Sequence, residues 1–161
     1  MKRNDVITLV VLAFVSALSS CFSAHKIQGV NLNGKWLLDS VKVEGSDTNY
    51  KFKTTVFNDV SSECLNGSVW NLFNNGNGYY TVQASLPNCR QGERQIYWSV
   101  RNDNGVNYFQ FKKLDNSTRP KNIEEGYRME ISSVTDNTLV LRSPANVDNQ
   151  TVYIVYSFTR Q

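Results

Sequence analysis

The chain has few of the residues that carry most enzymatic chemistry. It contains one histidine, His25, and that residue lies close to the N-terminus. A Ser-His-Asp relay, a cysteine-histidine pair or a multi-histidine metal site therefore cannot be built in the body of the chain. A Gly-x-Ser-x-Gly motif is missing as well. We expect no catalytic residues, no metal and no cofactor.

Paired carboxylates are the remaining catalytic alternative, and they favour a structural reading. Glu124 and Glu125 stand beside Gly126, which is typical of a solvated turn. Asp59 and Glu63 have i, i+4 spacing, so we expect both on one exposed face of a short helix between Val56 and Leu65.

Charge of one sign is also scarce. The chain has 17 Lys and Arg against 14 Asp and Glu, which gives a net charge of +3. Both signs are scattered along the sequence without a basic block, so we expect no nucleic-acid binding. Five cations could still form a basic rim for anionic lipid headgroups or an acidic ligand, with ordinary solubilising charges as the alternative: Arg101, Lys112, Lys113, Arg119 and Lys121.

A long apolar run is missing, but a short one stands near the N-terminus. Lys2 and Arg3 precede an apolar stretch of about 13 residues, Val6 to Leu18, which is shorter than the roughly 20 residues of a membrane-spanning helix. Leu18-Ser19-Ser20-Cys21 follows and matches the lipobox of bacterial lipoproteins. We therefore predict a signal peptide over 1–20 and an acylated tether over 21–32, anchored through Cys21. A conventional signal peptide with a chance cysteine is the alternative.

The residues after Cys21 suggest an address for the anchored protein. Phe22 stands where Asp would resemble an inner-membrane retention signal, which favours the outer membrane. The following residues lack the acidic run of some surface-exported lipoproteins, which favours the periplasmic side.

Two cysteines remain after Cys21 is assigned to the anchor. Cys64 and Cys89 would lie in an oxidising compartment after export, so we predict a disulfide between them. Two separate buried thiols are the alternative, while a redox pair is disfavoured because the spacing is unlike Cys-x-x-Cys.

Alternation of apolar and polar residues dominates the body of the chain. Tyr127, Met129 and Ile131, for example, would share one face of a strand. Clusters of Asn, Asp and Gly separate such segments and are typical of hairpin turns. We expect antiparallel strands near 35–43, 68–73, 78–86, 94–101, 106–114, 126–134, 138–143 and 150–160. Eight such strands favour an up-and-down barrel or a sandwich, while no clean strand can be drawn over 43–67.

Motifs at the two ends of this region carry a resemblance. Gly34-Lys35-Trp36 opens the first expected strand, and Arg160 stands at the end of the last. This pattern resembles the bacterial lipocalin-like proteins, in which a Gly-x-Trp motif opens the barrel and a late Arg packs over the indole. The resemblance implies an all-β, antiparallel, up-and-down eight-stranded lipocalin-like barrel over residues 33–161.

The resemblance also implies a binding function. An eight-stranded barrel holds one small ligand or is filled by its own side chains. The first hypothesis is therefore a lipid-anchored binding protein for a small hydrophobic molecule. The candidate pocket residues are Leu38, Tyr80, Val82, Ile96, Trp98, Met129, Ile131, Leu141, Ile154 and Tyr156, and Phe73 is expected to face inward with them.

The second hypothesis is a non-enzymatic accessory subunit of an outer-membrane protein complex, with a solid barrel core. It rests on the predicted anchor and on the aromatic residues expected on the outer strand faces, Tyr79, Tyr97 and Tyr153.

Overall fold

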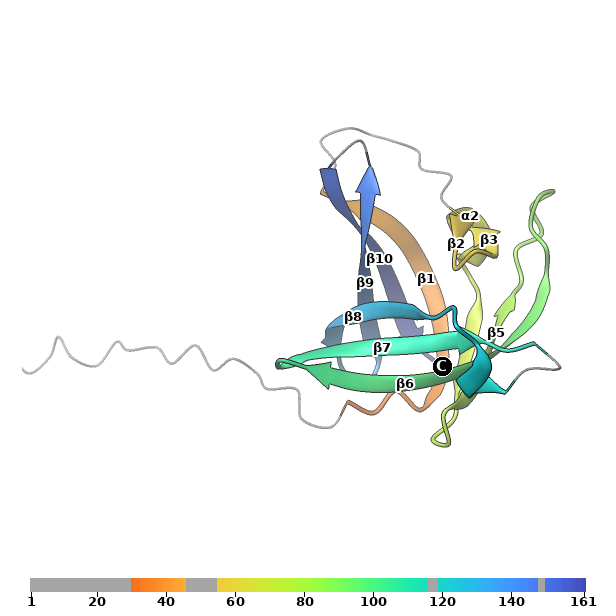
Figure 1. Ribbon diagram of the computed structural model, residues 1–161. Helices are drawn as coiled ribbons and strands as arrows, with labels where there is room; N and C mark the ends of the chain where they lie inside the picture. Colours follow the sequence, from red (N-terminus) through yellow and green to blue (C-terminus); the bar gives the residue numbers. More distant parts are fainter. Residues whose placement is uncertain (1–29, 46–54, 116–118, 148–149) are drawn as a thin grey trace, which may run out of the picture.

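The computed structural model describes residues 30–45, 55–115, 119–147 and 150–161. Most of these residues lie in one closed antiparallel barrel (Figure 1). The barrel strands are β1 (Gly34–Glu44), β4 (Val69–Leu72), β5 (Asn77–Val82), β6 (Gly92–Asp103), β7 (Val106–Lys113), β8 (Tyr127–Val134), β9 (Thr138–Val147) and β10 (Gln150–Arg160). The predicted all-β fold with eight barrel strands is confirmed.

Successive strands from β4 to β10 are hydrogen-bonded neighbours, as short turns require, and β1 closes the barrel between β10 and β4. In the closing register Trp36 lies opposite Arg160 of β10 and opposite Trp70 of β4. Because every barrel strand is paired on both sides, the barrel leaves no open sheet edge.

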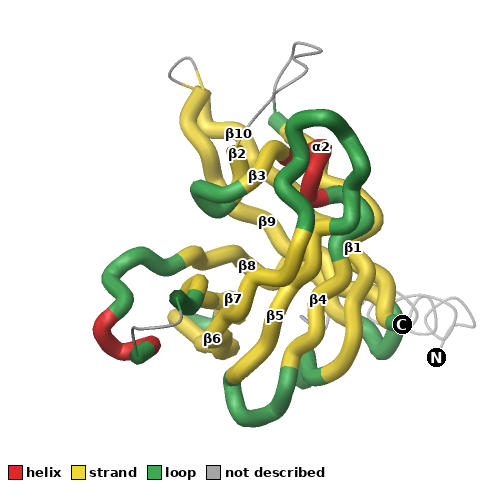
Figure 2. Tube along the Cα trace, turned by 90° about the vertical axis from the view of Figure 1, so that its right-hand side faces the viewer, coloured by secondary structure: helices red, strands yellow, loops and turns green. Residues whose placement is uncertain are grey.

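A short insertion lies outside the barrel wall, where no clean strand could be drawn from the sequence. It contains β2 (Thr55–Val56), β3 (Val60–Ser61) and the one-turn helix α2 (Ser62–Leu65). The helix expected from Val56 to Leu65 is therefore wrong over its first half, where a tight β2–β3 hairpin stands instead. We call residues 55–65 the strap. Figures 1 and 2 show the strap at the same end of the barrel as the tips of β9 and β10.

The barrel interior is filled largely by aromatic rings. Trp70 stacks on Tyr80 with ring centroids 4.6 Å apart, and Phe109 and Phe111 lie beside them. All four side chains are almost fully buried. Phe73 was expected to face inward, but it lies just beyond β4 and is 47% exposed. Trp70 and Leu72 supply the inner face of β4 instead, which shifts the expected register by one residue.

The end of the barrel opposite the strap is closed around Trp36. The indole Nε1 donates a hydrogen bond to the Leu32 carbonyl at 2.9 Å, and the Arg160 guanidinium lies 4.2 Å from the Trp36 ring centroid. Arg160 also donates to the carbonyls of Asn33 and Asp136. Gly34 has a φ of 123°, which favours glycine, and a β-carbon there would lie 2.6 Å from the Arg160 guanidinium and displace it. Leu32, at the end of the predicted tether, is itself buried.

Among the described residues, no helix combines the length and the apolar composition that a membrane crossing requires. The predicted signal peptide, Cys21 and most of the tether lie outside the described residues, so their placement stays a prediction.

Candidate ligand-binding site

The strap is fastened to the barrel covalently. Cys64 of α2 and Cys89 of the β5–β6 connection form a disulfide, which confirms the pairing predicted from the sequence. The Ser61 side chain caps α2 by accepting a hydrogen bond from the Cys64 amide. The strap therefore sits at a fixed place over one end of the barrel.

Phe57, at the tip of the β2–β3 hairpin, reaches into the barrel mouth. Its ring stacks on Tyr156 at 5.6 Å and meets Phe111 and Tyr127 edge-on at 4.9 and 5.2 Å. The Tyr127 hydroxyl donates to the Phe57 carbonyl at 2.7 Å. Phe57 and Asn58 adopt φ values of 55° and 46°, a left-handed conformation that non-glycine residues seldom take. The barrel contacts hold this turn in place.

Asp59, two residues after Phe57, holds the strap against the barrel by polar contacts. Its carboxylate accepts hydrogen bonds from the Tyr80 hydroxyl at 2.8 Å, Arg94 Nε at 2.9 Å and Arg90 at 3.2 Å. The Asp59 side chain is 4% exposed, so the expectation of an exposed helical face with Glu63 is wrong. Asp59 belongs to a hairpin turn that is folded against β5 and β6.

Burial and hydrogen bonding oppose each other at this carboxylate. Burial raises the pKa of Asp59, but hydrogen bonds from Arg94 and Tyr80, the nearby Arg94 charge and the Arg90 hydrogen bond together lower it below its ordinary value. Asp59 is therefore ionised at neutral pH. Burial, together with the hydrogen bond to Asp59 and its charge, raises the pKa of Tyr80, whose hydroxyl stays a donor.

A hollow of about 240 Å³ lies beside Phe57, between the strap and the inner faces of β8, β9 and β10. Its lining combines apolar side chains with several that carry polar groups. The lining residues are Thr55, Val56, Phe57, Gly126, Tyr127, Arg128, Met129, Ser143, Ile154 and Tyr156. The hollow is therefore a recess between the wall and the strap.

The Tyr156 hydroxyl is hydrogen-bonded to the Ser143 side chain, which places one polar pair in this hollow. Burial raises the pKa of Tyr156 to about 12, and the Ser143 hydrogen bond lowers it only in part. The hydroxyl therefore stays protonated at neutral pH.

Three of the ten candidate pocket residues line this hollow: Met129, Ile154 and Tyr156. The others lie elsewhere in the barrel core, and Tyr80 also takes part in the Asp59 cluster. These are Leu38, Tyr80, Val82, Ile96, Trp98, Ile131 and Leu141, all of them buried. The sequence-based candidates omitted Phe57, Tyr127 and Ser143. Alternation would have placed Tyr127 and Ser143 on inner strand faces, whereas Phe57 reaches the hollow through contacts that span long stretches of chain.

The other charged candidates are dispersed. Glu125 accepts a hydrogen bond from the Asn58 amide, and Glu124 is exposed. Within the described part of the chain, no group of three or more His, Cys, Asp or Glu residues is placed to hold a metal ion.

The expected basic rim is divided between different surfaces. Lys113 donates to the carbonyl of Asn58 in the strap, and Arg101 lies on the exposed outer face of β6. Lys112, Arg119 and Lys121 come together in a separate hollow.

Comparison with known proteins gives one match. The sequence model of the lipocalin-like domain matches residues 32–141, which is more than half of the chain and includes Gly34 and Trp36. No curated protein and no solved structure matches the chain. With its closed eight-stranded antiparallel barrel, the chain belongs to the lipocalin-like domain family.

Proposed function

We propose that this protein is a lipid-anchored, non-enzymatic binding protein that holds a small, mainly apolar molecule in the hollow beside Phe57. Lipocalin-like proteins are generally non-enzymatic binding proteins, and an eight-stranded barrel of this kind can accept one small ligand. The observation that carries the proposal is the hollow itself, where apolar side chains lie next to the hydroxyl pair of Tyr156 and Ser143.

The size of the hollow limits the ligand. A volume of about 240 Å³ equals roughly eight water molecules at about 30 Å³ each, so it suits a molecule on the order of ten non-hydrogen atoms. Typical drug-sized ligands need larger pockets. The rings packed around Trp70 occupy the rest of the barrel interior, so a long acyl chain does not fit without rearrangement.

The lining sets the chemistry. Phe57, Met129 and Ile154 offer an apolar surface, and the Tyr156 and Ser143 hydroxyls can donate and accept hydrogen bonds. A small phenol or a similar ring with one polar substituent satisfies both. Burying its ring would be favourable by about 25 cal/mol for each Å² of apolar surface removed from water.

Access to the hollow does not require the strap to detach. The disulfide and the Asp59 cluster both hold the strap on the β5–β6 side, whereas the hollow opens between the strap and β8, β9 and β10. We therefore expect the ligand to enter beside Phe57 and to leave the strap attached.

Calorimetric titration of the full chain with p-cresol tests the proposal. We expect saturable binding of one molecule per chain. Ile154→Trp fills the hollow and should reduce the affinity at least tenfold. Val106→Trp, at an exposed position of the β6–β7 hairpin, adds the same side chain elsewhere and should leave the affinity unchanged. Equal affinity in all three proteins would contradict the assigned site.

The membrane address is part of the same proposal. We propose that Cys21 is acylated after removal of residues 1–20 and that the barrel hangs from the outer membrane on its periplasmic side. The support is the Leu18-Ser19-Ser20-Cys21 motif behind a charged and apolar leader. Metabolic labelling with palmitate should mark the wild-type chain but not Cys21→Ser, and label that persists in Cys21→Ser would refute acylation at this residue.

A second candidate function is an accessory subunit of an outer-membrane complex. Its support is an aromatic pair on the outer wall, where Phe73 is 47% exposed and contacts Tyr79 at 6.1 Å between ring centroids. Exposed aromatic side chains are enriched at protein contacts. Purification through a C-terminal tag in mild detergent separates the two. A stoichiometric partner that is lost in Phe73→Ser would favour this function over ligand binding.

A further inference from the structure

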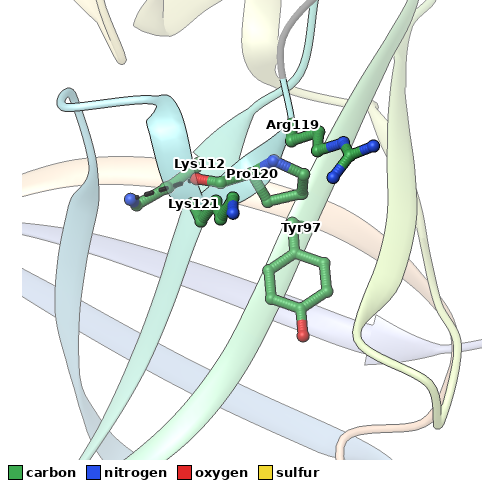
Figure 3. A pocket seen from close by; sticks show the side chains of 5 residues that line it. All are labelled: Tyr97, Lys112, Arg119, Pro120 and Lys121. Carbon is green, nitrogen blue, oxygen red and sulfur yellow. Dashed lines mark hydrogen bonds between the residues drawn. The ribbon is translucent and has the colours of Figure 1, made fainter.

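A second hollow lies on the outside of the barrel wall, away from the strap site. It measures about 540 Å³ and is lined by Tyr97, Lys112, Arg119, Pro120 and Lys121 (Figure 3). Tyr97 and Lys112 are cross-strand partners on β6 and β7. The other three residues belong to the segment around η1 (Pro120–Asn122), which lies over that part of the wall.

This segment is held in place by one of the cations. The Lys112 ammonium donates hydrogen bonds to the Pro120 carbonyl at 3.2 Å and the Ile123 carbonyl at 2.5 Å. Figure 3 shows the first of these bonds, with the Pro120 ring and the Tyr97 ring on the same side of it. These carbonyls accept hydrogen bonds from two of the three ammonium donors, and because they are neutral they do not balance the positive charge of Lys112.

The apolar part of the hollow is built from the rings of Tyr97 and Pro120. Tyr97 is 41% exposed although it lies within a strand. A β-carbon at Gly76 would come within 3.0 Å of the Tyr97 ring, so the ring packs directly on the backbone of the β4–β5 turn. Because it is braced in this way, Tyr97 offers a ring face that loses little conformational freedom on binding.

The charge of the hollow is of one sign. Lys112, Arg119 and Lys121 all line it, and no carboxylate does. The ion pairs found among the described residues involve Arg90, Arg94, Arg128 and Arg142, and none of these three cations. Glu124 lines a neighbouring hollow that shares Tyr97 and Lys112. Three cations for which the described residues supply no ion-pair partner surround an apolar surface, and they favour an anion with an apolar body.

We infer that this outer hollow is a binding site for a small amphipathic anion: a flat apolar ring that lies against Tyr97 and Pro120, with an acidic group held by Arg119 and Lys121. The volume lies within the range of small-molecule sites. Arg119 can bind a carboxylate, sulfonate or phosphate through two parallel hydrogen bonds, and Lys121 adds a point charge. The site is independent of the apolar hollow beside Phe57.

Three probes separate the parts of this inference: naphthalene-2-sulfonate carries ring and anion, 2-naphthol the ring, and sulfate the anion. In calorimetric titrations of the full chain at low ionic strength, we expect naphthalene-2-sulfonate to bind most tightly. Its affinity should fall about tenfold in Arg119→Glu/Lys121→Glu and again as salt is raised. Tyr97→Ala should also weaken it, while Tyr97→Phe should keep it.

A matched control makes the same change of charge on β1. Lys35→Glu/Lys42→Glu should bind naphthalene-2-sulfonate as the wild-type chain does, and Ile154→Trp should as well. Equal loss in both double variants would show a general charge effect and overturn the site. Sulfate that competes as strongly as naphthalene-2-sulfonate would overturn the apolar component. Charge-dependent binding to vesicles with anionic lipid, without binding of the free probe, would replace the site with a membrane contact.

Discussion

Removal of the Phe57 ring tests how the strap closes the barrel. The ring is 7% exposed and contacts Trp70, Phe111, Tyr127 and Tyr156. Truncation of a buried Phe to Ala typically costs about 3–5 kcal/mol. Because Phe57 lies at the end of the barrel, where the strap can partly settle into the space, we expect Phe57→Ala to lower the free energy of unfolding by about 3 kcal/mol.

The backbone at Phe57 makes a second variant informative. At φ 55° a non-glycine residue carries a penalty of about 1 kcal/mol that glycine avoids. Phe57→Gly should therefore be less destabilising than Phe57→Ala, by about 1 kcal/mol, although it removes one more carbon. Usually glycine is the more harmful of the two.

Urea unfolding followed by tryptophan fluorescence measures both changes, since Trp70 lies 6.0 Å from the Phe57 ring. Phe73→Ala, at an exposed position, is the control and should change the free energy of unfolding by no more than about 0.5 kcal/mol. The reasoning is refuted if Phe57→Ala costs less than about 1 kcal/mol, or if Phe57→Gly is the less stable of the two.

Three further perturbations test the Asp59 hydrogen bonds, the disulfide and the Arg160 contacts. Asp59→Asn should lower the free energy of unfolding by about 2–3 kcal/mol at pH 7. Because the pKa of Asp59 is lowered in the folded protein, the stabilisation by its carboxylate is complete above the ordinary value of 3.8 and is lost as pH falls through the folded-state pKa. In urea unfolding at a series of pH values, the difference in free energy of unfolding between Asp59→Asn and the wild-type chain should therefore shrink below about pH 4. A constant difference would contradict this. Cys64→Ser/Cys89→Ser should lower the free energy of unfolding by about 3 kcal/mol, because it removes the cross-link that closes the loop between the two cysteines. Thermal unfolding of the wild-type chain with and without reductant checks the same contribution. Equal stability in both conditions would argue against it. Arg160→Lys should cost about 1–2 kcal/mol in the same urea assay, because lysine cannot reach both the Asn33 and Asp136 carbonyls while lying on Trp36; an unchanged midpoint would count against that role.

The barrel itself was predictable because its information is local. Alternation in segments such as 127–131, with Asn- and Gly-rich turns between the strands, sets the strand number and the antiparallel order. Gly34, Trp36 and Arg160 were picked out as a motif from opposite ends of the chain, and they lie together in the structure. The one register error came at β4, where both Phe73 and Trp70 could have faced inward.

The strap was less predictable because its structure depends on tertiary contacts. Asp59 and Glu63 have helical spacing, but Phe57 and Asn58 take left-handed conformations, which Asn accepts readily and Phe seldom adopts. They are imposed by the barrel rings and by the Arg94 and Tyr80 side chains, which are distant in sequence.

The binding hollow was partly predictable for a similar reason. Met129, Ile154 and Tyr156 could be assigned to inner strand faces by alternation, and they do line the hollow. Ser143 follows Leu139 and Leu141 on the inner face of β9, but its hydrogen bond to Tyr156 has no signal in the sequence. The sequence therefore indicated the apolar walls of the hollow but not its polar pair or the strap residue that bounds it.

The most direct test of ligand binding uses a single reporter inside the hollow. The chain has two methionines, Met1 and Met129, and among the described residues Met129 is the methionine that lines the hollow. In the chain labelled with ¹³C at the methionine methyl groups, titration with p-cresol should shift the Met129 methyl resonance saturably and leave Met1 unchanged, and Ile154→Trp should abolish the shift. A Met129 resonance that does not move at saturating p-cresol would contradict the account.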